Sequence, residues 1–334
     1  MARLLFVGNI TVNQGPFIVN RRLVEKLPKN TLYATKNNQI INLFHVMFKL
    51  FFADVILYSN LSKINLFCIF WAKILRKKTI YLVHGGELYL LDGNESKSEK
   101  ADKRATKMLE GSCKILCVSE KFAKIARETY PQYAKKIGFL NNGVEWELFD
   151  KPAQKNVSRD ENTIMTIGGG VPRKRIYFIC LAIEAINKER EIPLKLIVLG
   201  NEGTDTEKIK NFDFVNYFDR IPKKEVENYY RSSKLYIQNS QFEPFGLAPI
   251  EALMCGCSLL ISRHTGILSI MKTERDCDII NDVDDPSEIK EKILFILEND
   301  NNEYLMDLID RETSSYDYAA KKLMEIVENL NSEK

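Results

Sequence analysis

The sequence predicts an α/β protein made of two doubly wound domains. The chain has 334 residues, enough for two domains of about 150 residues that each bury a hydrophobic core. Short apolar runs of strand length alternate with amphipathic helical segments, as in parallel sheets with helical crossovers. Residues 1–150 hold 23 Lys and Arg against 13 Asp and Glu, whereas the remainder holds 25 against 32. Halves of opposite charge indicate two domains with different partners.

The first half shows strands and helices in turn. Runs rich in Leu, Ile, Val and Tyr predict the strands, and segments with apolar residues three or four positions apart predict the helices. Pro131 ends the last of these helices, because proline cannot continue a helix. The predicted strands are at 4–7, 54–58, 79–83 and 114–119, and the predicted helices are at 17–27, 41–52, 66–75 and 121–130.

The second half repeats this alternation after a polar linker at 151–162. We expect domains at 1–150 and 163–315, followed by a C-terminal amphipathic segment at 316–334. The predicted strands are at 163–167, 194–199, 215–218, 235–239 and 259–262, and the predicted helices are at 176–188, 223–231, 249–255, 287–297 and 316–330.

The most informative stretch lies between the strand at 235–239 and the helix that follows it. Pro249 suits the first position of that helix, where a missing N–H costs little. The backbone N–H groups of residues 245–248 are then free to bind an anion, with the positive helix end behind them. Gly246 lets the backbone approach a ligand closely. The stretch therefore predicts a phosphate-binding loop.

Two carboxylates, Glu243 and Glu251, bracket this loop with seven residues between them. A carboxylate accepts hydrogen bonds from paired hydroxyls and does not bind phosphate, so one Glu on each side of an anion site suits a sugar, a diphosphate and a ribose. The spacing predicts a nucleotide-sugar site. In the alternative interpretation, Glu251 only complements the helix dipole in the first turn and Glu243 is a solvated loop residue.

The segment Glu-Pro-Phe-Gly-Leu-Ala-Pro-Ile-Glu-Ala-Leu-Met-Cys-Gly resembles the Glu-x7-Glu segment of the retaining glycosyltransferases of family 4. Members have the GT-B fold, in which two Rossmann-like doubly wound domains face each other across a cleft. The resemblance implies that Glu243 holds a hydroxyl of the donor sugar and that Glu251 holds the ribose diol. It also implies that Phe245, Gly246 and Leu247 offer backbone N–H groups near the sugar and phosphate.

A second anion site is predicted after the strand at 163–167, where three glycines lead into a cluster of cations. A small backbone followed by point charges suits a diphosphate, and the alternative is a solvated basic turn. The family carries an Arg and a Lys on the diphosphate here, and Lys174 matches that Lys. Gly169 stands where the Arg usually sits, so Arg173 or Arg175 would compensate.

Three further positions are assigned from the same resemblance. His84 follows the strand at 79–83, at the strand end where doubly wound sheets bind ligands, and it resembles the histidine that helps hold the donor sugar. Gly15 lies in a loop similar to the glycine-rich loop that faces the cleft. Ile221 lies where family members read the base through backbone groups. The alternatives are a structural histidine at His84 and an ordinary strand-to-helix turn at Gly15.

No metal and no cofactor besides the donor are expected. Residues 282–284 form an Asp-x-Asp sequence similar to the metal signature of the other large glycosyltransferase fold, but Asp285 and Pro286 follow at once, so helix capping explains them better. The seven cysteines form no Cys-x-x-Cys pair and are interpreted as reduced packing residues. The turn after the first strand lacks Gly-x-Gly-x-x-Gly, which excludes a nicotinamide-dependent oxidoreductase.

We therefore expect a retaining, metal-independent glycosyltransferase that uses a nucleoside-diphosphate sugar, with UDP as the expected nucleotide. The expected acceptor is a glycan or lipid-linked glycan in surface polysaccharide biosynthesis, and no nucleic-acid partner is expected. The resemblance implies that residues 1–150 bind the acceptor, that 163–315 bind the donor, and that 316–334 cross back onto the first domain.

The alternative function is a non-catalytic GT-B subunit that binds and positions a second transferase. The glycine at 169, in place of the expected Arg, favours this alternative. Retention of Glu243, Glu251 and His84 argues against it.

A cytoplasmic location is expected, because no secretory signal and no uncharged run of about 18 residues is present. The aromatic helix at 41–52 and the cluster Arg76, Lys77 and Lys78 predict contact with an anionic membrane at its inner face. In the alternative interpretation the aromatic residues belong to the core and the cations form a solvated face.

Overall fold

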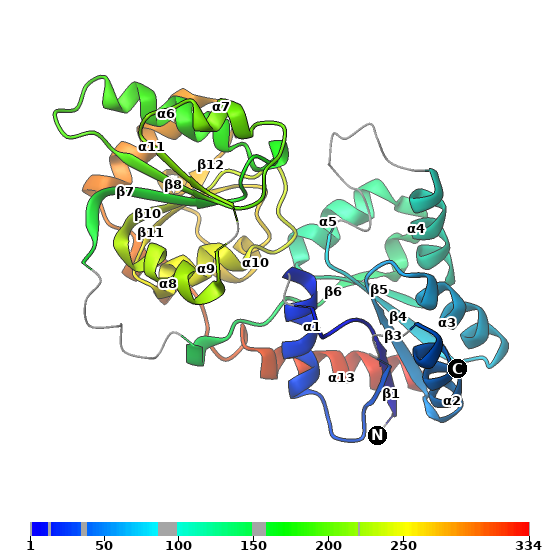
Figure 1. Ribbon diagram of the computed structural model, residues 1–334. Helices are drawn as coiled ribbons and strands as arrows, with labels where there is room; N and C mark the ends of the chain where they lie inside the picture. The colour runs from blue at the N-terminus through cyan, green and yellow to red at the C-terminus, as the bar shows by residue number, and fades with distance from the viewer. Residues whose placement is uncertain are drawn as a thin grey trace. The chain divides into compact units, whose positions relative to one another are not determined.

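In the part of the chain that the computed structural model describes, residues 2–12, 15–34, 39–85, 99–148, 158–219 and 221–333, two parallel sheets of six strands each organise the fold. The first unit contains Met1–Glu145 together with Arg311–Lys334, and the second contains Trp146–Asp310. Helices flank both sheets (Figure 1). The predicted fold class, an α/β chain with two doubly wound sheets, is confirmed.

The sheet of the first unit has the order β2-β1-β3-β4-β5-β6, with every neighbouring pair parallel. Its central strands are buried on both faces, which is why they read in the sequence as continuous apolar runs. The strands are β1 (Leu4–Val7), β2 (Leu32–Ala34), β3 (Val55–Ser59), β4 (Lys78–Val83), β5 (Lys114–Cys117) and β6 (Ile137–Phe139).

Helices lie on both sides of this first sheet (Figure 1). The last helix, α13, packs against α1, and Lys26 of α1 pairs with Asp317 of α13 at 2.8 Å. Figure 1 shows α13 along the sheet beside α1, whereas α2, α3 and α4 lie together on the other side. The helices are α1 (Gly15–Lys26), α2 (Gln39–Phe52), α3 (Lys63–Ile74), α4 (Glu99–Gly111), α5 (Glu120–Thr129) and α13 (Tyr316–Ser332).

The sheet of the second unit has the order β12-β11-β10-β7-β8-β9, which is the strand order of a Rossmann fold. The chain begins in the middle with β7, adds β8 and β9 on one side, and then returns to add β10, β11 and β12 on the other. The strands are β7 (Asp160–Ile167), β8 (Lys195–Leu199), β9 (Val215–Phe218), β10 (Ser233–Gln238), β11 (Ser258–Ser262) and β12 (Ile279–Ile280).

Helices cover both faces of this second sheet. Figure 1 shows α6, α7 and α11 on one face and α8, α9 and α10 on the other. The α6 and α11 helices pack against each other, and their isoleucines form the core with the buried residues of the sheet. The helices are α6 (Ile176–Asn187), α7 (Thr206–Lys210), α8 (Lys223–Ser232), α9 (Leu247–Met254), α10 (Leu268–Met271), α11 (Pro286–Glu298) and α12 (Asn302–Asp307).

Two expectations about helix starts are corrected. The helix α9 begins at Leu247, so Pro249 occupies its third position and not its first. Proline still fits, because the third residue also has no partner for its N–H inside the helix. Ser119 ends no strand; it caps α5, and its side chain accepts a hydrogen bond from the N–H of Phe122 at 3.1 Å.

The aromatic residues of α2 and α3 are not all core residues. Val46, Leu50, Cys68 and Ala72 are fully buried, as a core helix requires. Four phenylalanines of α2 and two apolar residues of α3 are instead between 49% and 69% exposed. We call these six residues the aromatic face: Phe44, Phe48, Phe51, Phe52, Phe70 and Ile74.

Candidate functional site: the strand switch point of the second unit

The residues predicted to bind a donor meet at the carboxyl ends of β7 and β10. These two strands are neighbours in the sheet, and the strand order reverses between them. In doubly wound sheets ligands bind at such a switch point, because the two following loops leave in opposite directions and open a crevice. The loop after β7 carries Lys174, and the loop after β10 carries Glu243.

Lys174 and Glu243 form a direct ion pair between Nζ and Oε2. Only 14% of the Lys174 side chain and 18% of the Glu243 side chain are exposed, so the pair is shielded from bulk water. The alternative interpretation of Glu243 as a solvated loop residue is therefore wrong. Arg173 lies beside the pair, with Nη1 3.9 Å from Oε2 of Glu243.

Charge and burial shift both pKa values of the pair. Burial acts to raise the pKa of the Glu243 carboxyl, but the positive charges of Lys174 and Arg173 outweigh it and hold the pKa below its ordinary value. Burial lowers the pKa of the Lys174 ammonium, and Arg173 lowers it further against the attraction of Glu243. Glu243 is thus kept as a carboxylate, able to accept hydrogen bonds.

Arg173 and Arg175 point to different partners. Nη1 of Arg173 donates to the carbonyl oxygen of Phe242 at 2.9 Å, which holds the guanidinium next to Glu243. Arg175 instead pairs through Nε with Oδ1 of Asp284 at 2.7 Å. Of the two arginines considered as replacements for the missing cation, Arg173 is the one beside Lys174 and Glu243.

Gly169 cannot be replaced by the expected Arg without moving the backbone. Its φ is +56°, and a Cβ atom there would collide with the backbone of Gly200 and with the carbonyl oxygen of Asn201. The N–H of Gly169 donates to the oxygen of Leu199 at 3.0 Å, which ties the turn to the end of β8. The backbone conformation and the close neighbours at position 169 therefore require a glycine in this chain.

The backbone around Glu243 is held by the turn after β11. The N–H of Glu243 donates to the oxygen of His264 at 3.1 Å, and the N–H of Gly266 donates to the oxygen of Glu243 at 2.8 Å. Gly246, which caps α9, has a φ of +89°, and a Cβ there would press on the side chains of Thr265 and Glu243. The carboxylate is thus fixed on a loop with backbone support from both sides.

The start of α9 supplies donors next to this carboxylate. The first N–H groups of a helix have no partner inside it, so those of Gly246, Leu247 and Ala248 suit an anion. Glu251 lies in the second turn, which contradicts the alternative interpretation that it complements the dipole in the first. Its Oε2 lies 3.4 Å from the hydroxyl of Tyr230.

The remaining predicted positions of the second unit contribute no side chain to the ion pair. Ile221 follows the edge strand β9, and Phe245 has a side chain that is 2% exposed, so only its backbone can serve a ligand. Asp285 caps α11 and accepts from the N–H of Ser287 at 2.8 Å, as capping predicts. Within the described ranges, no three His, Cys, Asp or Glu side chains are grouped to hold a metal.

The first unit has its own polar cluster at His84, just after β4. The Nε2 atom of His84 lies 3.0 Å from Oγ of Ser59 and 3.1 Å from Oδ1 of Asn20. Burial lowers the pKa of His84 to about 4, so the ring is neutral at physiological pH. Gly15, the first residue of α1, is exposed and has open space around it.

Sequence reasoning missed Asn20 and Ser59 as partners of His84. The sequence pattern could have identified Asn20, because it is a polar residue on the buried face of α1, together with Val19 and Leu23. A fully buried polar side chain needs hydrogen-bond partners, which lie here at the ends of neighbouring strands.

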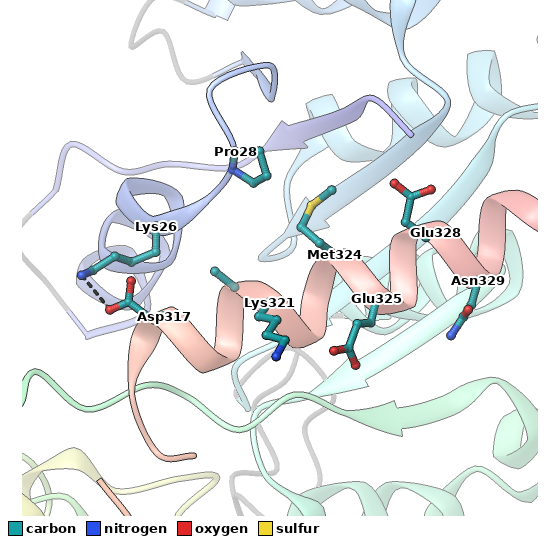
Figure 2. Close-up of a pocket in the computed structure, with 9 residues that line it drawn as sticks. Lys26, Pro28, Asp317, Lys321, Met324, Glu325, Glu328 and Asn329 are labelled. Atoms are coloured by element: carbon teal, nitrogen blue, oxygen red, sulfur yellow. Dashed lines mark hydrogen bonds and ion pairs between the residues drawn. The ribbon is translucent and has the colours of Figure 1, made fainter. Parts of the chain in front are cut away.

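The first unit also has a hollow on its surface, between two of its helices. It is formed where α1 ends against α13 (Figure 2), and Asp317 at its rim pairs with Lys26. Glu328 on the same helix accepts a hydrogen bond from the N–H of Ala2 at 2.7 Å. The hollow is lined by both acidic and basic side chains from α13, and none of the predicted site residues contributes to it.

The comparison with protein families decides the nature of the second unit. Residues 149–314 match the model described as glycosyl transferases group 1. This stretch is a glycosyl transferases group 1 domain. The domain contains Arg173, Lys174, Glu243 and Glu251.

Curated relatives share part of this chain. The O-antigen chain mannosyltransferase B of Escherichia coli is 25% identical over 141 residues, which are 40% of this chain and 36% of that protein. A probable sucrose-phosphate synthase of Thermosipho melanesiensis is 24% identical over 217 residues, which are 61% of this chain and 50% of that protein. The matches thus span about a third to a half of the length of these relatives.

Solved structures share the fold over the whole chain. The sucrose-phosphate synthase of Thermosynechococcus elongatus has a TM-score of 0.68 at 17% identity, with 100% of both chains covered. The Anabaena protein HepE in complex with UDP has a TM-score of 0.70 at 13% identity, covering 98% of this chain and 100% of that chain. The chain therefore has the GT-B fold, with the glycosyl transferases group 1 domain as its second unit.

No helix within the described ranges is both long and apolar enough to cross a lipid bilayer.

Proposed function

We propose that this chain is a retaining, metal-independent glycosyltransferase that takes a sugar from a nucleoside-diphosphate sugar. The observation that carries the proposal is the meeting of Lys174, Arg173 and Glu243 at the strand switch point of a glycosyl transferases group 1 domain. Lys174 and Arg173 can neutralise a diphosphate, and the Glu243 carboxylate beside them can accept hydrogen bonds from sugar hydroxyls.

The proposed chemistry depends on stabilising a departing diphosphate. Lys174 and Arg173 supply positive charge, and the first N–H groups of α9 add donors that need no reorganisation. Glu243 accepts from a hydroxyl of the donor sugar, and Glu251 accepts from the ribose. Retention then arises by attack of the acceptor on the same face as the leaving group, so no enzymic nucleophile is required.

The expected donor is a UDP-sugar, and the expected acceptor is a glycan or lipid-linked glycan in surface polysaccharide biosynthesis. Support for the donor comes from HepE, whose solved complexes hold UDP and UDP-glucose. Support for a glycan acceptor comes from the relative named O-antigen chain mannosyltransferase B.

The alternative, a non-catalytic GT-B partner subunit, depended on the glycine at 169. Arg173 and Lys174 both lie beside Glu243, so the absence of an Arg at 169 leaves two cations at the switch point. We therefore favour the enzyme.

A donor panel tests the proposal. Purified protein is heated with UDP-, GDP- and ADP-sugars, and a ligand at about 100 times its Kd should add about 2.7 kcal/mol of stability. The stabilising donor should also release its nucleoside diphosphate on prolonged incubation, equally with and without EDTA. Stabilisation without turnover would support the partner subunit. No stabilisation by any donor would overturn both functions, and activity restored only by added Mg²⁺ or Mn²⁺ would overturn the metal-free mechanism.

We also propose that the protein works as a peripheral enzyme at the inner face of the cytoplasmic membrane. The support is the aromatic face: Phe44, Phe48, Phe51 and Phe52 follow the spacing of one helix side, and α3 packs beside α2. Such aromatic side chains suit the interfacial layer of a bilayer.

Charge around the aromatic face matches an anionic lipid surface. Residues 39–78 hold six Lys and Arg against a single acid, Asp54. Asp54 accepts a hydrogen bond from the N–H of Arg3 at 2.8 Å. Each cation near an anionic bilayer contributes about 1 kcal/mol, so this segment suits such a surface better than a neutral one.

A further inference from the structure

Three polar side chains meet at the ends of neighbouring strands in the first unit. Ser59 ends β3, His84 follows β4, and Asn20 reaches them from α1, which follows β1. The strands β1, β3 and β4 are adjacent in the sheet. Ser59 and Asn20 are 2% and 0% exposed, and His84 is 9% exposed, so their hydrogen bonds are shielded from water.

The orientation of the Asn20 amide is set by a fourth group. Its Nδ2 donates to the backbone oxygen of Asn9 at 3.2 Å, and a carbonyl oxygen can only accept. The other end of the amide, Oδ1, therefore faces Ser59 and His84. The hydroxyl of Ser59 donates to this same Oδ1 at 2.8 Å, which uses the only hydrogen that Ser59 has to give.

These directions decide the tautomer of His84. Nε2 lies within hydrogen-bond distance of two atoms, Oδ1 of Asn20 and Oγ of Ser59, and neither has a hydrogen to offer it. Nε2 must therefore carry the proton and donate. A neutral imidazole with a proton on Nε2 has a lone pair on Nδ1, and within the described ranges no group bonds to Nδ1.

We propose that Asn20 is a positioning residue that holds His84 as the Nε2–H tautomer, so that Nδ1 is a fixed acceptor for a substrate hydroxyl. The role toward substrate rests on the proposed glycosyltransferase function, whereas the tautomer does not. His84 then receives a hydrogen bond from a sugar and donates none. Ser59 has a lesser part, because Asn20 alone fixes the proton on Nε2.

Nitrogen NMR of the histidine rings tests the tautomer directly. The chain has three histidines, and a His84→Gln variant identifies the signals of the ring in question. The expected spectrum has a protonated Nε2 and an unprotonated Nδ1 that do not change between about pH 5.5 and 8, since an ordinary histidine titrates near 6.5. A proton on Nδ1, or a mixture of the two tautomers, would overturn the proposal.

A matched pair of variants separates Asn20 from Ser59. In Asn20→Ala the Ser59 hydroxyl becomes free to donate to Nε2, so the proton should move to Nδ1. In Ser59→Ala the Asn20 oxygen remains, so the proton should stay on Nε2. The same tautomer in both variants would contradict the assigned role.

The variant Asn20→Asp gives a pH readout that a merely structural role would not produce. Within the described ranges, the side chains that bond to the His84 ring are those of Asn20 and Ser59, and both are uncharged. A carboxylate at position 20 would place a negative charge on an atom that bonds to the ring. The His84 pKa should then rise into the neutral range, and donor turnover should fall at least tenfold as pH drops through it and recover above it.

The experiments distinguish a failure of the proposed glycosyltransferase activity from a failure of the proposed role of His84 Nδ1. If the protein turns over no donor, the NMR results still decide the tautomer. If turnover of Asn20→Asp has the same pH profile as the wild type while its His84 titrates near neutral pH, the substrate role of Nδ1 is wrong.

Discussion

Lys174 and Glu243 form an ion pair that joins the loop after β7 to the loop after β10. The two residues are 69 positions apart in the chain, and their loops follow neighbouring strands of the sheet. Each charge offsets the desolvation of the other, and removal of one would leave the other buried without its partner. In the proposed donor site, the energetic effect of replacing Lys174 therefore depends on the presence of Glu243, and the reverse also holds.

Glu243→Gln should leave the fold intact and remove most transfer. The amide oxygen can still accept from Lys174, but its NH₂ group is a donor where the sugar hydroxyl requires an acceptor. The melting temperature and the steady-state rate measure the two effects. Glu251→Ala is the companion variant, and it should mainly raise the KM for the donor. Transfer by Glu243→Gln at the wild-type rate would show that the role assigned to Glu243 is wrong.

Lys174→Ala should slow transfer by about 10²–10³-fold, the range for losing one preorganised partner of developing charge. Arg175→Asn is the matched control, because Arg175 pairs with Asp284 and asparagine tolerates its φ of +52°. We expect the control to keep nearly the wild-type rate. Equal losses in both variants would mean that overall charge, and not the place of Lys174, governs the rate.

Gly169→Ala should destabilise the second unit and displace the turn that positions Lys174. A non-glycine residue at a left-handed φ costs about 1–3 kcal/mol, and the added Cβ would also meet the carbonyl of Asn201. Gly15→Ala is the control, since a Cβ there meets no atom within 4 Å. Thermal unfolding of both variants measures the difference. A Gly169→Ala protein as stable as Gly15→Ala would contradict the steric argument.

Stability should fall as the pH drops from about 6.5 toward 4, in part through His84. Its pKa is lowered to about 4 by burial, so the unfolded chain binds a proton in this window that the folded chain does not. The difference between this pKa and the ordinary histidine pKa of about 6.5 corresponds to a loss of at most about 3 kcal/mol in the free energy of unfolding. Thermal unfolding over this range should show a shallower loss for His84→Gln than for the wild type. Parallel curves would mean that His84 is protonated in the folded protein.

Membrane contact should require anionic lipid and weaken with salt. Sedimentation with liposomes should recover the protein on anionic vesicles at low salt, and screening should reduce the recovery. Replacement of Arg76, Lys77 and Lys78 by Ser should weaken binding, and so should Phe44→Ser with Phe48→Ser. Equal recovery on neutral and anionic vesicles, or no pelleting at low salt, would discard the membrane proposal and leave the transferase proposal untouched.

A charge-matched control tests whether membrane binding depends on the position of the three cations or only on the net charge of the protein. Lys188, Lys195 and Lys208 of the second unit have side chains that are 69%, 58% and 63% exposed. Their replacement by Ser removes the same charge from another surface. The proposal expects this control to bind anionic vesicles like the wild type.

The sequence by itself determined the α/β alternation, and most of the predicted elements of the second unit end within a few residues of those observed. Strands such as β9 (Val215–Phe218) and helices such as α11 (Pro286–Glu298) follow from local apolar periodicity and from Pro and Gly. The segment from Glu243 to Gly256 also predicted the loop and the helix of the proposed donor site. These features depend on neighbours within a few positions, so local patterns suffice.

The tertiary structure alone decided which of these residues meet. Arg173 and Arg175 are equivalent in a local pattern, yet one lies beside Glu243 and the other pairs with Asp284. Likewise, the apolar sequence of α2 does not tell which side packs, and Phe44 proved exposed while Val46 is buried. The physical reason is that these outcomes depend on strand order and helix packing, which bring together residues tens of positions apart and which no local periodicity encodes.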